Sequence, residues 1–477
     1  MDSRLTTQDA SFYFLEAGST PMHLGSLAIL RAPDSGLDYE DLLTHVERRL
    51  SLVPRYRQRV REVALGLARP VWVDDCDFDI TYHVRRSALP KPGSDEQLHD
   101  LVARLTSRPL DRSRPLWEMY LVEGLADDRV AIFTKSHSAL VDGLRALEIG
   151  QVLFDECDNP RQVPDELWMP GREPRESELV MGALAEMIAR PAEGVATIKH
   201  LVGDVVGTAT SALGNAAALV RTAATTAPST PLNATISRNR RFATAKTSLE
   251  DYRTVRSKFH CSVNDVVLTV LTGALRNWLL SRGEPVTAFS TVRAMVPIAV
   301  HLSNADANVD ADVDAAEDPD SVPQNFDRRA SSLLIDLPVG EPNPVVRLSH
   351  IAHATEAHSR QNRTMTAQTL VQVSGTAPPT LHAVGLRLAA GLSQRMFNVM
   401  ITNAPGPQAP LCLGSAQLLE TYPVSPLIRN QALSIGLTSY DGHVYYGLNG
   451  DRDAMSDVDV ITGLLYEALD ELLEACR

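Results

Sequence analysis

One segment of the chain places residue types that could move a proton at the end of a predicted strand. The apolar run Val130–Thr134 predicts the strand, and His137 and Ser138 come two residues after it. Asp142 and Gly143 then close a turn, after which a helical pattern begins. A histidine titrates close to neutral pH, so at such a turn it is suited to take a proton from a hydroxyl nucleophile. The pattern therefore indicates a base that assists a hydroxyl nucleophile.

Ser138 cannot serve as that base. Its hydroxyl is about as weakly acidic as that of an alcohol substrate, so it can relay a proton or form a hydrogen bond but cannot hold the proton. Neighbouring residues of an extended segment point to opposite faces, so His137 and Ser138 face different surroundings. Two interpretations of His137 stay open: a working base if the turn brings it into the site, or a structural, hydrogen-bonded histidine if it faces away. The pair lacks the facing geometry and the orienting third group of a nucleophilic triad.

The residues after the turn are interpreted as supporting groups. We expect Asp142 to hold the turn through backbone N–H groups or an arginine, and Gly143 to permit a backbone geometry closed to other residues. An ordinary Asp-Gly turn is the alternative interpretation for both. Asn264 and Asp265 stand at the start of a predicted helix that runs to Leu280, with Asn264 as its N-cap.

Strand and helix signals alternate along both halves of the chain, which predicts an α/β architecture with two domains of similar size. The boundaries expected are 1–180 for the first domain, 181–228 for an Ala-rich helical linker, and 229–477 for the second domain. A basic cluster, Arg238, Arg240 and Arg241, opens the second domain. The predicted elements are strands at 25–30, 71–73, 117–122, 130–134, 293–300, 331–337, 399–402, 433–438 and 444–448, and helices at 38–52, 264–280 and 457–475.

Composition narrows the function classes. The net charge of −14 and the pI near 5.4 argue against a nucleic-acid-binding surface. The five cysteines are scattered and lack a CxxC pair, which favours a reduced, cytoplasmic protein without a disulfide framework or zinc site. Neither a signal peptide nor a membrane-spanning stretch is evident. The acidic segment 304–323 matches a calcium loop incompletely and is expected to be a solvated loop without metal.

Several ordered motifs together resemble those of the wax ester synthase/diacylglycerol acyltransferase family. Its HHxxxDG signature corresponds to residues 137–143, with Ser138 in place of the second histidine. The likeness covers essentially the whole chain and includes these further segments: Leu5–Phe12, Pro21–Ser26, Pro115–Glu118, Glu123–Leu125, Thr230–Asn233, Val263–Leu268, Met295–Pro297, Asn403–Pro407, Ser439–Gly442 and Asp451–Asp453.

The resemblance implies two chloramphenicol-acetyltransferase-like (condensation-domain-like) domains with a tunnel between them. Acyl-CoA is then the co-substrate, diacylglycerol or a long-chain alcohol is the acceptor, and no cofactor, metal or covalent intermediate is required. His137, Ser138 and Asp142 align with catalytic positions, and Gly143, Asn264 and Asp265 with positions that shape the tunnel; a plain helix cap explains Asn264 equally well.

The function expected is therefore acyl-CoA-dependent O-acyl transfer in triacylglycerol or wax ester synthesis. The alternative is a catalytically impaired paralogue that binds acyl-CoA or lipid, or that regulates an active relative. The expected location is the cytoplasm, with peripheral contact to the inner membrane face or to lipid bodies. Ser138 is the feature that separates the two functions, because only a residue that holds a proton can replace the missing base.

Overall fold

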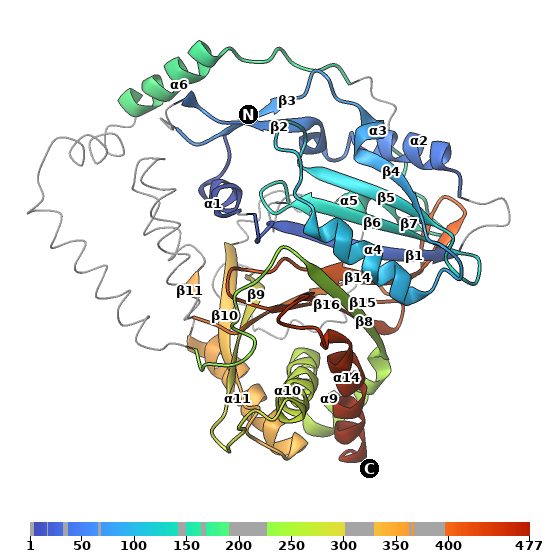
Figure 1. The fold of residues 1–477 in the computed structure, drawn as a ribbon, viewed down its shortest axis with the longest axis vertical. Coiled ribbons are helices and arrows are strands. Elements are labelled where there is room, and N and C mark those ends of the chain that lie inside the picture. The colour runs from blue at the N-terminus through green and yellow to red at the C-terminus, as the bar shows by residue number, and fades with distance from the viewer. Residues whose placement is uncertain are drawn as a thin grey trace, which may run out of the picture.

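The computed structural model describes residues 4–16, 18–31, 37–64, 68–141, 149–163, 168–189, 227–300, 329–361, 365–366 and 396–477. Two seven-stranded sheets, a two-stranded ribbon and surrounding helices make up this part of the chain (Figure 1). The α/β prediction is therefore confirmed. The predicted boundaries between the domains stay a prediction, and the acidic segment 304–323 lies outside the described residues.

The first sheet combines strands from both ends of the chain. Its order is β4-β5-β6-β1-β14-β13-β7, and β1 lies between β6 and β14, antiparallel to both. Two of these strands, β13 and β14, come from the second half of the chain and complete a sheet that the first half begins. Its strands are β1 (His23–Arg31), β4 (Val84–Ala88), β5 (Trp117–Glu123), β6 (Arg129–His137), β7 (Asp155–Glu156), β13 (Leu411–Leu413) and β14 (Ala416–Val424).

The second sheet comes from the second half alone, with the order β11-β10-β9-β12-β15-β16-β8. Its strands are β8 (Arg240–Ser248), β9 (Val292–Val300), β10 (Arg329–Leu337), β11 (Met365–Thr366), β12 (Val399–Pro405), β15 (Leu433–Tyr440) and β16 (His443–Asp451). The separate ribbon pairs β2 (Gln58–Arg61) with β3 (Val71–Asp74).

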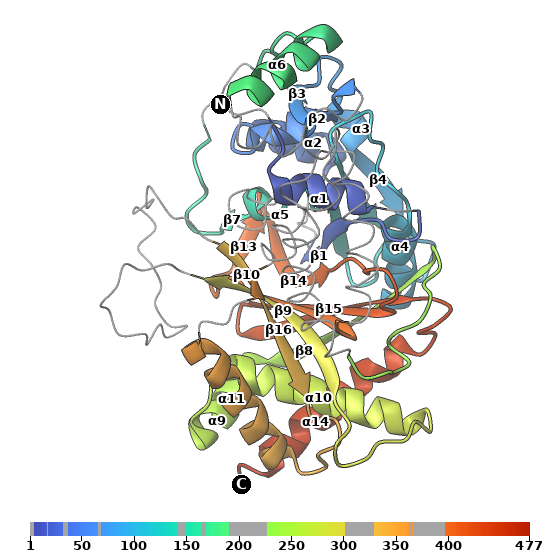
Figure 2. The ribbon, with the colours of Figure 1, turned by 90° about the vertical axis from the view of Figure 1, so that its left-hand side faces the viewer.

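Most helices lie toward the two ends of the molecule, whereas α4 lies between β1 and β8 (Figures 1 and 2). Those of the first half are α1 (Thr7–Leu15), α2 (Tyr39–Arg49), the 3-10 turn η1 (Pro54–Arg57), α3 (Ile80–His83), α4 (Asp95–Ser107), α5 (Ile149–Leu153) and α6 (Glu176–Ala189). Those of the second half are α9 (Leu249–Phe259), α10 (Val263–Ser281), α11 (Pro344–Gln361) and α14 (Val458–Glu474). The described helices include none that is long and apolar enough to cross a membrane.

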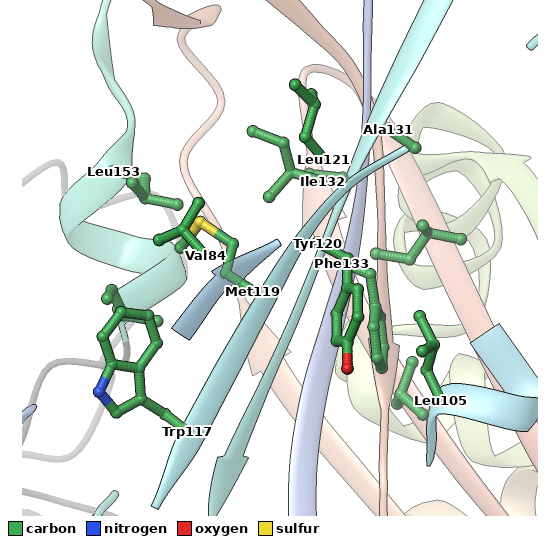
Figure 3. Packing of buried hydrophobic residues seen from close by; sticks show 14 of the residues in the cluster. Val84, Leu105, Trp117, Met119, Tyr120, Leu121, Ala131, Ile132, Phe133 and Leu153 are labelled. Atoms are coloured by element: carbon green, nitrogen blue, oxygen red, sulfur yellow. The ribbon is translucent and has the colours of Figure 1, made fainter. Parts of the chain in front are cut away.

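Each sheet carries its own hydrophobic core, and the first core supports the end of β6. Side chains of β5 and β6 alternate between the two faces of the sheet, so that Met119 and Ile132 lie on the side of Leu153 of α5, while Tyr120 and Phe133 lie on the side of Leu105 of α4 (Figure 3). Phe242 of β8 also belongs to this core. The two halves therefore share packed apolar surface, which fixes β6 against the second half.

The two sheets approach closely where β14 passes over β15 and β16. A Cβ on Gly447 would lie 1.9 Å from the carbonyl oxygen of Pro423, and one on Gly436 would lie 2.9 Å from the Pro423 ring. No larger residue fits at Gly447 without a shift of the backbone, because a real Cβ does not approach an oxygen that closely. These two glycines let the strand that completes the first sheet lie against the second.

Most predicted strands and helices are confirmed, with three kinds of error. The strand predicted at 130–134 continues to His137, so this histidine ends a strand instead of standing in a turn. The predicted N-cap Asn264 is wrong, because Ser262 caps α10 and forms a capping box with Asp265. Several elements were not predicted, among them α1, α4, α9, α11, β4, β8 and β14.

The expectation that all cysteines are reduced is also wrong. Cys157 and Cys412 form a disulfide, while Cys76, Cys261 and Cys476 are free. The bonded pair is separated by 255 residues, and the pairing of β7 with β13 brings the two sulfurs together. Sequence spacing cannot reveal this pair, since the contact exists only once the second half has joined the first sheet.

Candidate active site at the end of strand β6

The backbone builds a tight turn where β6 ends. His137 is the last residue of the strand and lies opposite His23 on β1. The Ser138 N–H donates to the Met22 carbonyl at 2.8 Å, and the Leu140 N–H donates to the His137 carbonyl at 2.8 Å. The turn is therefore held both by the neighbouring strand and by its own backbone, so the position of residue 138 is well determined.

The His137 side chain is buried and its hydrogen-bonding capacity is partly used. The ring is 1% exposed, and Nδ1 accepts a hydrogen bond from the Ala139 N–H at 2.9 Å. An accepting Nδ1 carries no proton, so the proton of the neutral ring sits on Nε2, which lies 3.8 Å from Glu16 Oε2. Burial lowers the pKa of His137 to about 3, which the Glu16 charge opposes only in part. The ring is thus neutral at pH 7, and its one lone pair is engaged.

Glu16 is the centre of a buried cluster of charged and titratable groups. Its Oε1 lies 3.0 Å from His23 Nε2, and its Oε2 accepts a hydrogen bond from Arg112 Nη2 at 2.8 Å. Burial alone would raise the Glu16 pKa, but His23, His137 and Arg112 outweigh it and lower the pKa to about 2. Glu16 is therefore a carboxylate at neutral pH, placed between two histidine rings.

Sequence reasoning missed the role of this cluster. His23 falls within the family-like segment Pro21–Ser26, and no pattern in the sequence marks Glu16 or Arg112 as site residues. A signal was present for the position of Glu16, because Thr6 and Asp9 form a capping box that starts α1 and so places Glu16 at its C-terminal end. Nothing in the sequence links Arg112 to this helix, because the two meet only in the folded protein.

The hydroxyl of Ser138 donates a hydrogen bond to the backbone. Its Oγ lies 2.9 Å from the Met22 carbonyl oxygen, and the residue is 6% exposed. The Met22 carbonyl thus accepts from both the N–H and the hydroxyl of Ser138. In this arrangement Ser138 reinforces the turn, and it has no group that could retain a proton taken from a substrate.

The strand behind the turn is fixed by further buried polar contacts. Lys135 is 1% exposed, lies 3.0 Å from Glu118, and donates to the carbonyls of Leu105 and Arg108 at the end of α4. Burial lowers the Lys135 pKa, and the Glu118 charge opposes this shift. These contacts fasten β6 to α4 two residues before His137.

Tyr56 joins β6 to the element that follows the site turn. Its hydroxyl lies 3.3 Å from Ser136 Oγ and accepts a hydrogen bond from the N–H of Ile149 at 3.0 Å. Asp142 and Gly143 lie between these two anchors but outside the described residues, so their predicted roles stay predictions. Both ends of the segment that contains them are nevertheless held by one buried tyrosine.

Asn264 and Asp265 lie in the second half, in the first turn of α10. Asn264 Oδ1 accepts from Asn403 Nδ2 at 3.2 Å, which links α10 to β12. Asp265 is buried; it accepts from the Ser262 N–H at 2.9 Å and from the Thr355 hydroxyl at 2.6 Å. These contacts position α10 and α11, and no contact to the β6 turn is among them. Across the described residues, no group of His, Cys, Asp or Glu could hold a metal ion.

Comparison with protein families accounts for most of the chain. Residues 5–267 match the wax ester synthase/diacylglycerol acyltransferase catalytic domain, and residues 329–473 match the WS/DGAT C-terminal domain. The first match contains β6, its turn and the Glu16 cluster, and extends to the start of α10. The site described above therefore lies within the part that the family model calls catalytic.

Relatives with known names agree with these matches. The chain is 55% identical over 268 residues to a probable diacylglycerol O-acyltransferase, tgs3, of Mycobacterium tuberculosis, covering 55% of this chain and 98% of that one. It is 33% identical to the probable diacylglycerol O-acyltransferase tgs1 of the same organism, covering 99% and 96%. The wax ester synthase/diacylglycerol acyltransferase of Marinobacter aquaeolei VT8 superimposes with a TM-score of 0.68 at 27% identity, covering 99% of both chains. The chain therefore belongs to the wax ester synthase/diacylglycerol acyltransferase family.

Proposed function

We propose that the protein transfers a fatty acyl group from acyl-CoA to the hydroxyl of diacylglycerol or of a long-chain alcohol. The observation that carries this proposal is the turn at residues 137–140, which lies within the catalytic-domain match and whose sequence resembles the family's signature. The named relatives are diacylglycerol O-acyltransferases and a wax ester synthase/diacylglycerol acyltransferase, and none of these names points to a non-catalytic protein.

The reaction sets a clear requirement for a proton acceptor. The acceptor hydroxyl oxygen forms a bond to the thioester carbonyl carbon, the carbon–sulfur bond breaks, and the hydroxyl proton ends on the sulfur of CoA. A base near the hydroxyl typically contributes roughly 10²- to 10⁴-fold to such a step. Ser138 does not meet the requirement, since its hydroxyl already donates to the Met22 carbonyl.

We assign His137 a structural role in holding the turn. Its Nδ1 lone pair is taken by the Ala139 N–H, and its Nε2 faces Glu16 instead of open space. Turnover then depends on orientation of the two substrates and on a proton acceptor supplied by the substrate or by solvent. Orientation of bound reactants can itself contribute several kcal/mol. We therefore expect slow acyl transfer in the natural sequence.

The remaining predicted residues receive supporting roles in this proposal. Asp142 and Gly143 shape the turn beyond Val141, and Asn264 and Asp265 set the start of α10 on the second half's side of the site. Acyl-CoA is the co-substrate and no cofactor is invoked. Since diacylglycerol and fatty alcohols partition into lipid, we also propose that the protein works at the cytoplasmic membrane face or at lipid bodies. Flotation with diolein-containing vesicles tests that location.

Product analysis tests the function directly. Purified protein is incubated with palmitoyl-CoA and either diolein or hexadecanol, and the ester is quantified by mass spectrometry. We expect ester formation by the natural protein above a protein-free control, and an increase on the order of 10²-fold or more in Ser138→His. Ser138→Ala is the matched control, because it removes the hydroxyl without adding a base. No ester from the natural protein with either acceptor would overturn the proposal, and activity confined to Ser138→His would identify a scaffold that lacks its base.

A further inference from the structure

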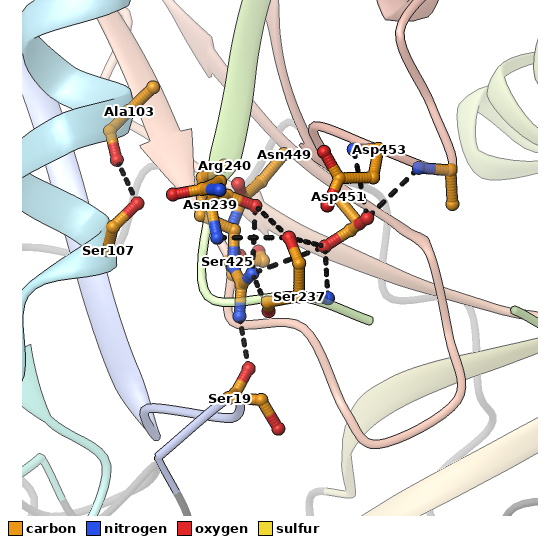
Figure 4. A network of polar contacts seen from close by, with 11 residues as sticks. Ser19, Ala103, Ser107, Ser237, Asn239, Arg240, Ser425, Asn449, Asp451 and Asp453 are labelled. Carbon is orange, nitrogen blue, oxygen red and sulfur yellow. Dashed lines mark hydrogen bonds and ion pairs between the residues drawn. The ribbon is translucent and has the colours of Figure 1, made fainter. Parts of the chain in front are cut away.

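A residue of the second half reaches across to the segment that carries the Glu16 cluster. Arg240 begins β8 and is 4% exposed. Its Nη2 donates a hydrogen bond of 2.5 Å to the carbonyl of Ser19 (Figure 4). Ser19 lies in the connection between Glu16, at the end of α1, and His23, at the start of β1. Arg240 thus touches the short segment that joins two of the residues packed around His137.

The second half holds this guanidinium rigidly. Arg240 Nη1 donates to the carbonyls of Ser237 at 2.9 Å and Asn239 at 3.1 Å, and lies 3.7 Å from Asp451 Oδ2 (Figure 4). Asp451 is fully buried and accepts from the backbone and hydroxyl of Ser237. An arginine fork held by several acceptors has little freedom to reorient, so the position of its free edge is fixed by β8 and β16.

The opposite end of the contact is equally specific. Glu16 approaches His23 at 3.0 Å and His137 at 3.8 Å, so a displacement of the connection at Ser19 alters both distances. His137 in turn receives the Ala139 N–H that closes the site turn. Asp451 in the second half is therefore connected to the turn in the first by these contacts together with the short backbone segment between Glu16 and His23.

We propose that Arg240 is a positioning residue for acyl transfer. By holding the Ser19 carbonyl, it sets the Glu16 cluster, and through it the β6 turn, relative to the second half. The inference rests on the proposed function for its kinetic consequence but not for its structural one. Within the basic cluster of Arg238, Arg240 and Arg241, this positioning role belongs to the buried Arg240 and not to its neighbour Arg241.

The neighbouring residue supplies a matched control. Arg241 follows Arg240 on β8, yet its side chain is 41% exposed and forms an ion pair with Asp459 of α14. Arg240→Gln and Arg241→Gln therefore remove the same charge from adjacent positions, and only the first loses the contact with Ser19. Arg240→Lys keeps the charge near Asp451 but loses the fork, so it should fall between the natural protein and Arg240→Gln.

Histidine labelling reports on the cluster independently of activity. His23 and His137 are each 1% exposed and should react slowly with diethyl pyrocarbonate, as should His83, which is fully buried elsewhere in the first half. In Arg240→Gln we expect the labelling rate of His23 and His137 to rise by about tenfold, because the structure around these two residues opens locally more often. His83 should stay protected. Arg241→Gln should label like the natural protein.

Kinetics supply the second measurement. We expect Arg240→Gln to lower kcat by about tenfold or more with little change in KM for palmitoyl-CoA, since a misplaced turn affects orientation more than binding. Unchanged labelling and kcat in Arg240→Gln would overturn the inference, as would equal exposure of His83, which indicates general loosening. If the natural protein forms no ester, the proposed function fails, and the labelling pattern alone then decides the role of Arg240.

Discussion

Replacement of His137 by asparagine separates a structural histidine from a catalytic one. The asparagine Oδ1 can take the place of the ring Nδ1 and accept the hydrogen bond from the Ala139 N–H, which now spans 2.9 Å. What is lost is the rest of the ring, which lies 6.1 Å from the Tyr13 ring and 6.0 Å from the His23 ring between centroids. Partial truncation of a buried side chain of this size costs about 1–3 kcal/mol.

Alanine at the same position removes the acceptor as well. The buried Ala139 N–H then has no partner from residue 137, which adds about 1–3 kcal/mol. We therefore expect the free energy of unfolding to fall by about 3–5 kcal/mol in His137→Ala and by clearly less in His137→Asn. Urea unfolding, followed by tryptophan fluorescence, measures both values on the same protein preparations.

The activities of the two variants decide the role of the histidine. If His137 is structural, ester formation by folded His137→Asn stays within about tenfold of the natural protein, because no base has been removed. The reasoning is refuted if His137→Asn is folded under the assay conditions and yet loses roughly 10²- to 10⁴-fold in kcat, which is the loss expected of a general base. Ser138→Ala serves as the control, since Met22 still accepts the N–H of residue 138.

Three further predictions concern stability. Burial lowers the pKa of His137 to about 3 and that of His83 to about 4, so below about pH 6.5 the unfolded chain binds protons that the folded chain does not. The free energy of unfolding should therefore fall as the pH is lowered from 6.5 to 4, and it should fall less steeply in His137→Asn. A flat profile would contradict the assignment. Lys135→Met removes one partner of a buried ion pair and should cost about 3–5 kcal/mol by urea unfolding, whereas a cost below 1 kcal/mol would show that Glu118 is satisfied without it. Cys157→Ser opens a cross-link between residues 255 apart and should cost about 2–4 kcal/mol, and a reductant should lower the natural protein to the same value while leaving the variant unchanged.

Local patterns in the sequence identified the parts of the fold that depend on nearby residues. The apolar runs at 130–134 and 433–438 became β6 and β15, and the helical spacing after residue 263 became α10. Such patterns are reliable because a helix and a strand each bury one face, and the apolar residues of that face recur with a period that differs between the two. The missed helix α4 also carried a local signal, the capping box of Ser94 and Gln97, so this omission was avoidable.

The candidate site was predicted only in part, for a physical reason. The turn with His137 and Ser138 is a local feature of one strand and could be located from the residues alone. The surroundings that decide its chemistry come from elsewhere: Glu16 from α1, and Arg240 from the second half of the chain. No spacing rule connects residues so distant in sequence.

The sequence by itself determined the α/β class, the places along the chain of the strands it predicted, and the replacement of the expected base by Ser138. Tertiary structure decided that the Nδ1 lone pair of His137 is engaged, that Cys157 meets Cys412, and that β14 completes a sheet begun by β1. The first group follows from side-chain chemistry and periodicity, which are properties of the chain. The second follows from contacts between distant segments, and whether a buried imidazole can act as a base depends on those contacts and not on its identity.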